Sequence, residues 1–328
     1  MNPIDRYVPV AVVERSGAIE SFHTGVMVAL RPDGSVAAAV GDPCVVVYPR
    51  SSNKPVQATA MVEAGLELPP DLLALACASH SGTAAHLAGV RRVLRDHGLD
   101  ESNLANTEGL PIGPEALADH LRAGGSASRV TMNCSGKHAA MLATCVVNGW
   151  PIDESYLDAA HPLQRRITNV LGRLAGEEPA GIGVDGCGAP AHRLSLLGLA
   201  RAMSSIVRGE TPAAAQVARA MAAYPEMVGG PGRQVTDLMR AVPGMMAKDG
   251  ADGVFIAALP GGATVAAKIA DGTDRALLLL VAAGLASLGV DVGAFESIWR
   301  VPVLGHGHPV GAVRPIGPVA ALLADTAG

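Results

Sequence analysis

The feature that most limits the possible folds is the order of residue patterns along the chain. Short apolar runs separated by turns predict strands before residue 50 and again after residue 244. Between them, apolar residues recur at helical spacing, as in 84–97 and 212–223. The expected fold is therefore α/β of the α+β type, in a single domain spanning 1–328. One antiparallel sheet would come from about 1–50 and 244–328, with a helical region of about 51–243 inserted.

Composition excludes several classes of protein. Hydrophobic residues make up 49% and charged residues 17%, which is typical of a globular chain. A formal net charge of −5 gives no basic surplus for binding nucleic acid. The N-terminus has no secretory pattern, and the longest apolar stretch, 276–288, is too short to span a bilayer. With five scattered cysteines, these features predict a cytoplasmic protein without a membrane or nucleic-acid partner.

Lysine is scarce in this chain. Lys and Arg together number 25, and only four of them are lysines: Lys54, Lys137, Lys248 and Lys268. A buried lysine can lose its proton, whereas arginine stays protonated in proteins. The retained lysines are therefore candidates for proton transfer. The alternative is a compositional bias toward arginine, with four lysines left by chance.

The segment RSSNKPVQA, residues 50–58, carries the strongest chemical pattern. Ser51 and Lys54 are three residues apart, so on a helix they share one face. Pro55 fits only the first turn, which predicts that the helix begins near Ser51. A neutral lysine there could take the serine proton, as in Ser-x-x-Lys acyl-transfer enzymes. The plain alternative is that Ser51 caps the helix and Lys54 is a surface charge.

Two further segments could contribute to the same cleft. In ACASHSGT, residues 76–83, an apolar run ends in Ser79, His80 and Ser81, although a polar turn explains this pattern equally well. Lys268 lies in the apolar segment TVAAKIA, where a charged amine is costly unless it is paired. It could be a second catalytic lysine facing the cleft, or an edge lysine pointing at water.

Two other segments contain potential metal ligands. NCSGKHAAML, residues 133–142, places Cys134, Lys137 and His138 at the start of an apolar helix. The Gly-rich segment GVDGCGAPAH, residues 183–192, places Asp185 and Cys187 two residues apart. Thiolates with a carboxylate or imidazole suit zinc, although these spacings also fit a capped helix and a tight turn.

Taken together, these segments resemble the asparaginase II family, the rhizobial-type L-asparaginases. RSSNKPVQ, CASHSG, NCSGKHAAML, VDGCGAP, KDGADGVF and AAKIADG follow one another in the family's order across nearly the whole chain. The resemblance implies a fold like the serine β-lactamases and penicillin-binding proteins, and a homodimer. It also implies hydrolysis of L-asparagine to aspartate and ammonia.

The resemblance further implies the members of the site. Ser51 with Lys54 and Ser79 with Lys268 would form two Ser–Lys tandems, with Ser81 the other candidate for the second serine. A zinc ion would bind Cys134, Asp185 and Cys187. The side chains expected around the substrate are Arg50, His80, Lys137 and His138. Lys248, in KDGADGVF, is expected to lie away from the tandems.

Two other functions compete with this one. A zinc-dependent amidase or deaminase would use metal-bound hydroxide as its nucleophile, although the H-x-E and P-C-x-x-C pattern of cytidine deaminases is missing. A non-catalytic amino-acid-binding protein of the same fold would bind asparagine without turnover. Release of ammonia distinguishes it from both enzymes.

Overall fold

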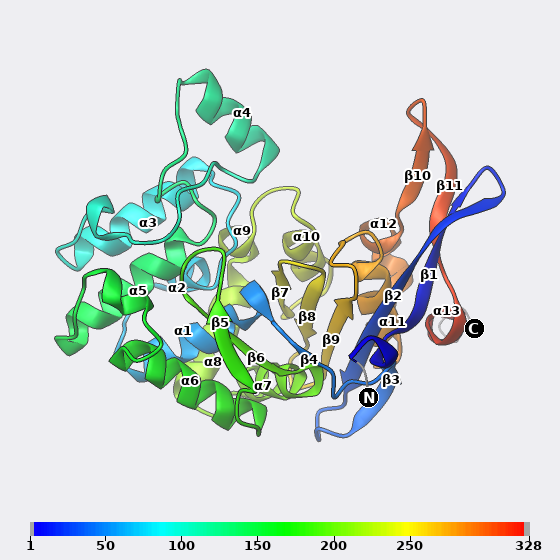
Figure 1. Cartoon of the computed structure of the whole chain (residues 1–328), viewed down its shortest axis with the longest axis horizontal. Coiled ribbons are helices and arrows are strands. Elements are labelled where there is room, and N and C mark those ends of the chain that lie inside the picture. Colours follow the sequence, from blue (N-terminus) through cyan, green and yellow to red (C-terminus); the bar gives the residue numbers. More distant parts are fainter. Residues whose placement is uncertain (1–2, 325–328) are drawn as a thin grey trace.

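An antiparallel sheet joins both ends of the chain in the computed structural model, which describes residues 3–324 (Figure 1). Its strand order is β10-β11-β1-β2-β9-β8-β7, and β3 pairs with β2. The strands are β1 (Val8–Arg15), β2 (Ala18–Leu30), β3 (Val36–Val40), β7 (Met246–Gly250), β8 (Val254–Ala258), β9 (Thr264–Ile269), β10 (Pro302–Gly305) and β11 (His308–Pro315). The expected α+β class, with a sheet drawn from both ends, is confirmed.

The middle of the sheet is apolar on both faces. Residues 26–30 of β2 are all fully buried, as are most of those in β8 and β9. Helices α7 (Leu196–Arg208) and α11 (Leu277–Ala286) both pack against β2 and β9. The central strands therefore appear as continuous apolar runs instead of alternating patterns, because helices cover them.

The inserted region is mainly helical. It begins with the 3-10 turn η2 (Arg50–Asn53), which leads directly into α1, and Pro55 lies in the first turn of α1, as its missing N–H requires. The helices of this region, besides α7, are α1 (Lys54–Glu63), α2 (Pro70–Ala76), α3 (Ala84–Asp96), α4 (Pro114–Arg122), α5 (Ser135–Asn148), α6 (Pro162–Ala175), α8 (Pro212–Ala223), α9 (Pro225–Val228) and α10 (Gln234–Ala241). Helices α12 (Glu296–Trp299) and α13 (Gly317–Ala324) come after β9 and lie outside the inserted region.

One segment differs from its expected structure. The apolar spacing of residues 192–207 predicts a helix throughout, but the first of them belong to β6 (Pro190–Ser195). This strand pairs with β5 (Gly181–Val184) and β4 (Val46–Val47) in a second, three-stranded sheet. Helix α7 starts only after Ser195, whose side chain accepts a hydrogen bond from the Gly198 N–H. Pairing with β4, far away in sequence, therefore overrides the local helical pattern.

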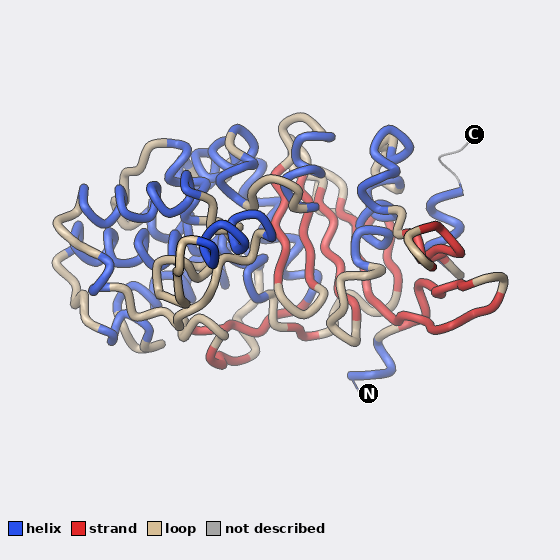
Figure 2. The backbone as a smooth tube through the Cα atoms, turned by 90° about the horizontal axis from the view of Figure 1, so that it is seen from above, coloured by secondary structure: helices blue, strands red, loops and turns tan. Residues whose placement is uncertain are grey.

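A single hydrophobic core extends through the sheet and the helical region. Seen from above, the helices of the inserted region gather on one side of the large sheet, whereas α12, α13 and the hairpins β1–β2 and β10–β11 lie toward its other end (Figure 1 and Figure 2). Within residues 3–324, none of the helices has the length and apolar character needed to cross a membrane. The side chains of the candidate site lie where the edge strand β7 meets the helical region.

Candidate functional site

Ser79 lies between two buried lysine amines, in the loop that follows α2. Its Oγ is 2.9 Å from Lys248 Nζ and 3.2 Å from Lys54 Nζ. The three residues are 5%, 0% and 2% exposed, respectively. Ser81, the other candidate for this position, donates its hydroxyl to the Gly229 carbonyl at 2.9 Å and contacts neither amine. The structure therefore singles out Ser79 as the hydroxyl shared by two lysines.

Local sequence explains how these groups meet. Lys54 is the first residue of α1, so its side chain starts at the helix end that faces the Ser79 loop. Strand β7 carries Lys248 and packs against the η2 turn. A Cβ atom at Gly250 would lie only 2.6 Å from the Pro49 carbonyl oxygen, so this close approach requires glycine.

The structure does not bring the expected pair, Ser79 and Lys268, together. Lys268 Nζ instead donates to the backbone carbonyls of Asp252, at 2.7 Å, and Ile269, at 2.5 Å. Lys268 is on β9, which β8 separates from the Lys248 strand β7. Adjacent strands lie about 4.8 Å apart, so the two lysines project from positions about 10 Å apart across the sheet.

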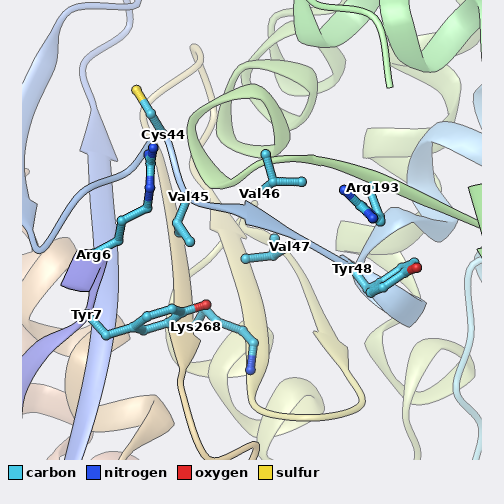
Figure 3. A pocket seen from close by; sticks show the side chains of 9 residues that line it. All are labelled: Arg6, Tyr7, Cys44, Val45, Val46, Val47, Tyr48, Arg193 and Lys268. Carbon is cyan, nitrogen blue, oxygen red and sulfur yellow. The ribbon is translucent and has the colours of Figure 1, made fainter. Parts of the chain in front are cut away.

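Lys268 lines a different cavity of about 530 Å³, together with Tyr7 and the residues around β4 (Figure 3). The expectation that Lys248 lies away from the site is wrong, because its Nζ is 2.9 Å from Ser79 Oγ. The segment KDGADG has the composition of a turn, so its sequence does not indicate the short strand β7 that begins just before it. The signal that could have identified Lys248 was the scarcity of lysine itself.

Lys248, one of the two amines that contact Ser79, has a lowered pKa. Burial and the nearby Lys54 cation lower the pKa of Lys248 to about 8, although the Asp249 carboxylate opposes the shift. Its other hydrogen bonds go to the carboxylate and the backbone carbonyl of Asp249. Lys54 donates to the Ala78 carbonyl, to Ser79 and, at 3.2 Å, to the Cys134 sulfur. Three acceptors around one amine suit an ammonium ion.

Ser51 occupies a different place from Ser79. It is half-buried and lines a narrow cavity with Lys54, Lys137 and Asp185. Among the described residues, no hydrogen bond joins Ser51 to Lys54, so the expected first tandem shares a cavity without direct contact. The cavity has about 10 Å³ of room, enough for about one water molecule. Arg50 closes it by pairing with Asp185, Nε to Oδ1, at 2.8 Å.

Two thiols lie beside the amines, and they are not equivalent. Cys134 and Cys187 are both buried, and Lys137 Nζ is 3.1 Å from the Cys187 sulfur. The hydrogen bond from the Cys134 thiol, with the nearby Lys137 cation, holds the pKa of Cys187 far below its ordinary value. The same bond, with burial, raises the pKa of Cys134. These contacts therefore favour the thiolate form of Cys187, with Lys137 as its counter-ion.

The expected ligand set of Cys134, Asp185 and Cys187 is not assembled. Over residues 3–324, no group of three or more His, Cys, Asp or Glu side chains is placed to hold a metal ion. The Asp185 carboxylate instead accepts hydrogen bonds from Arg50 and from the Gly186 N–H at 2.8 Å. Two thiols and the Lys137 amine do converge, and sulfur with nitrogen donors suits zinc.

Two histidines expected at the substrate, His80 and His138, are buried and make hydrogen-bond contacts with other side chains. His80 is fully buried and its Nε2 is 2.9 Å from Ser135 Oγ; burial lowers its pKa well below the ordinary value. His138 Nδ1 is 2.8 Å from the Tyr156 hydroxyl, and burial lowers the pKa of His138 to about 4. Neither histidine lines the narrow cavity. Both are therefore neutral near pH 7.

The three backbone N–H groups from Ser79 to Ser81 are already engaged in hydrogen bonds. The N–H groups of Ser79, His80 and Ser81 already donate to the carbonyls of Val228, Asn133 and Gly229 at 2.8–3.1 Å. The amines of Lys54 and Lys248, which contact Ser79 Oγ, are therefore the donors in place to stabilise charge that develops on an oxygen there.

A buried hydroxyl between two amines, one of which, Lys54, also lines the narrow cavity, is the arrangement of an enzyme that activates a nucleophile. The model of the L-asparaginase II family matches residues 11–315 of the 328, so the chain belongs to the L-asparaginase II family. It is an amidohydrolase of the L-asparaginase class. Among curated proteins, none matches the chain.

Proposed function

We propose that the protein hydrolyses L-asparagine to L-aspartate and ammonia by Ser–Lys acyl transfer. The observation that carries this proposal is the position of Ser79 Oγ, 2.9 Å from Lys248 and 3.2 Å from Lys54. A hydroxyl is a weak nucleophile unless a base takes its proton. Lys248, with a pKa lowered to about 8, is partly neutral at physiological pH and can be that base.

Arg50 and Asp185 give the cavity the charges that an α-amino acid needs. Their ion pair closes the cavity beside Ser51 and Lys54. A zwitterionic amino acid can replace such a pair, because Arg50 can bind its carboxylate and Asp185 its ammonium group. The side-chain amide would then point inward toward the amines. This supports a free amino acid amide as the substrate.

The reaction would take two steps. Ser79 Oγ attacks the carboxamide carbon while its proton passes to the neutral Lys248 amine. The C–N bond breaks as the amide nitrogen takes that proton, and ammonia leaves a β-aspartyl ester on Ser79. Water then attacks the ester and gives a proton to Lys248, which returns it to the departing Ser79 Oγ. The second proton of the water passes to solvent, and aspartate is released.

Lys54 would stabilise the developing negative charge. Its ammonium donates toward Ser79 Oγ, and the backbone N–H groups nearby are already engaged. One such donor is typically worth about 3 kcal/mol in the barrier. Ser51, on the cavity wall, is the alternative nucleophile, with Lys54 as its base. It needs a movement of Lys54 away from Ser79 and Cys134.

A zinc ion beside the site is a second part of the proposal. Cys134 and Cys187 would hold it as thiolates, with Lys137 as the nearest further donor if it is neutral, and Asp185 only if Arg50 releases it. Zinc bound there would supply a positive charge that polarises a nearby substrate group. The residues of the chain itself would still carry out the proton transfers described above.

The fold kinship with serine β-lactamases and penicillin-binding proteins is also a proposal. It is supported by a sheet built from both chain ends and by a Ser-x-x-Lys segment at the start of a helix beside that sheet. The homodimer and the cytoplasmic location stay predictions from the sequence. A sedimentation mass equal to one 33.2 kDa chain would contradict the dimer.

Ammonia release tests the function. The purified protein, supplied with zinc, should release ammonia from L-asparagine with a much higher kcat/KM than from L-glutamine. Hydroxylamine added during turnover should yield β-aspartyl hydroxamate, because it intercepts an acyl-enzyme. Turnover without hydroxamate would favour direct attack by metal-bound hydroxide, and binding of asparagine without any ammonia would favour the amino-acid-binding protein.

A further inference from the structure

Two charged residues outside the proposed reaction form a brace on the Lys248 amine. Asp249, next to Lys248 on β7, contacts its Nζ through both the carboxylate and the backbone carbonyl. Arg233 holds that carboxylate from the other side, Nη2 to Oδ2, at 2.7 Å. It also reaches the backbone carbonyl of Ser79, at 3.4 Å. The four residues therefore form a ring of contacts: Ser79 contacts Lys248, Lys248 contacts Asp249, Asp249 contacts Arg233, and Arg233 contacts the Ser79 carbonyl.

This arrangement is unusual for neighbouring residues of a strand. Successive side chains of a strand point to opposite faces, so Lys248 and Asp249 would ordinarily diverge. Here both converge beside Ser79, at the edge strand of the sheet. Arg233 reaches them from the N-terminal end of α10, at the end of a loop that Gly230 and Gly232 turn with positive φ angles of 122° and 69°.

We propose that Asp249 and Arg233 are positioning residues that hold the Lys248 amine against the Ser79 hydroxyl and control whether that amine is charged. The proposal deepens the proposed function, on which its catalytic consequence rests. Neither residue contacts the Ser79 hydroxyl that would attack the substrate. Asp249 acts through Lys248, and Arg233 acts through both Asp249 and the Ser79 backbone.

The charges around Lys248 support this role. Burial, Lys54 and Arg233 lower the pKa of Lys248, and Asp249 raises it. Burial alone would raise the pKa of Asp249, but Lys248 and Arg233 hold it at about 2, so Asp249 is an anion at any working pH.

Two more titratable groups lie close by. Burial raises the pKa of the Cys77 thiol to about 12, so it stays uncharged. Burial, and the Asp249 charge, raise the pKa of the Asp274 carboxyl. The carboxylate in contact with Lys248 is that of Asp249. The two brace residues therefore act on the Lys248 amine with opposite signs.

Because Asp249 and Arg233 carry opposite charges, removing each of them should shift the pKa of Lys248 in opposite directions. In Asp249→Asn the amine loses its anion, so Lys248 should give up its proton at a lower pH, by about 1 unit or more. In Arg233→Gln a repelling cation is removed, so Lys248 should titrate at a higher pH than in the parent. Arg233→Lys keeps the cation and should stay near the parent value. A merely structural role of the pair would not separate the variants by the sign of the removed charge.

Lysine-selective ¹³C labelling measures these shifts directly. The chain has only four lysines, so the spectrum contains four side-chain signals, and Lys248→Gln identifies the one of interest by its loss. The expected midpoint in the parent is about 8. Equal midpoints in parent, Asp249→Asn and Arg233→Gln, or shifts of both variants in one direction, would overturn the proposal.

Kinetics then test the catalytic consequence. If Lys248 is the base, the acidic limb of kcat/KM should move in the same directions as the NMR midpoints, and kcat should fall about tenfold or more in Asp249→Asn, a loss of about 1.4 kcal/mol or more in the barrier. The surface pair Arg91–Glu101, 2.6 Å apart, provides matched controls: Arg91→Gln and Glu101→Gln should change neither midpoint nor rate.

The titration needs no substrate. A parent protein that fails to release ammonia from asparagine would refute the proposed function while the NMR result still decides the brace. Unchanged kcat and an unmoved acidic limb in an active Asp249→Asn protein would refute the brace and leave the asparaginase activity intact.

Discussion

Lys54 and Lys248 share one hydroxyl, whereas Lys268 reaches only backbone carbonyls. This difference between three lysines determines what each can do. A general base needs a pKa near the working pH, and burial beside another cation lowers the pKa of a lysine. Lys268 also has a lowered pKa because it is partly buried, but no serine hydroxyl lies in contact with it. Whether a lysine can act as the base therefore depends on its contact with a serine hydroxyl, and a lowered pKa alone is not enough.

Replacement of single lysines by arginine should separate these roles. Lys248→Arg and Lys54→Arg keep the positive charge but cannot supply a neutral amine or the same compact donor, so each should lose about 10²- to 10⁴-fold in kcat. Lys268→Arg should stay within about threefold of the parent, a change of less than 1 kcal/mol. Steady-state ammonia release measures all three. Full activity in Lys248→Arg would exclude Lys248 as the base.

Removal of one thiol should remove the metal. We expect about one zinc per chain in the parent and little in Cys187→Ala, because zinc prefers thiolate ligands and Cys187 is the anionic sulfur. Cys44→Ala changes an exposed thiol and should keep its zinc, which makes it the control. Elemental analysis after dialysis gives the ratio. Full zinc content in Cys187→Ala would show that this cysteine is not a ligand.

Among the secondary structure elements, α5 is the one whose placement the thiol and amine groups depend on. Its first turn carries Lys137 next to Cys134, and it packs against α2, which leads into the Ser79 loop. The two helices can approach closely because of Gly136. A Cβ at that position would lie 2.6 Å from the Leu75 carbonyl oxygen, which is backbone and cannot move aside. The glycine therefore determines how far Lys137 lies from the loop.

A matched pair of glycine substitutions tests this contact. Gly136→Ala should destabilise the protein by about 1–3 kcal/mol, because the clash with α2 exceeds the gain in helix propensity. Gly172→Ala in α6 meets its nearest atom at 3.5 Å, an ordinary contact. It should therefore stabilise by up to about 1 kcal/mol. Thermal unfolding measures both changes, and equal effects of the two substitutions would contradict the packing argument.

For the whole molecule, the main consequence of the fold is that distant parts of the chain share one core. Strand β1 pairs with β11, near the other end of the chain, and β2 pairs with β9. The hydrophobic core extends from this sheet through α1, α5 and α6 of the helical region. Neither part covers its apolar surface without the other. The sheet and the helical region should therefore unfold together.

The two tryptophans report on the two parts separately. Trp150 follows α5 in the helical region, and Trp299 is in α12, near the sheet, with its indole N–H bonded to the Val292 carbonyl. In Trp299→Phe the fluorescence reports only Trp150, and in Trp150→Phe only Trp299. Within each variant, the fluorescence midpoint should equal the midpoint from circular dichroism. Separate midpoints in either variant would indicate two independently folding units.

The sequence by itself determined the local features of this protein. Pro55 sets where α1 starts, the spacing of Ser51 and Lys54 puts them on one cavity, and apolar runs at both ends predict the shared sheet. These features depend on residues close together in the chain, so local sterics and hydrophobic periodicity are enough to specify them. The order of the six motifs likewise led to the family that the model match supports.

Only the tertiary structure decided which groups meet. Ser79 and Lys248 are 169 residues apart, and Arg50 and Asp185 are 135 apart. No local pattern specifies such contacts, since they follow from strand order and from how closely the helices pack. Lys268 was the natural partner by analogy, but β8 lies between its strand and β7. The site thus depends on the order of the strands across the sheet, which cannot be read from the spacing of residues in the sequence.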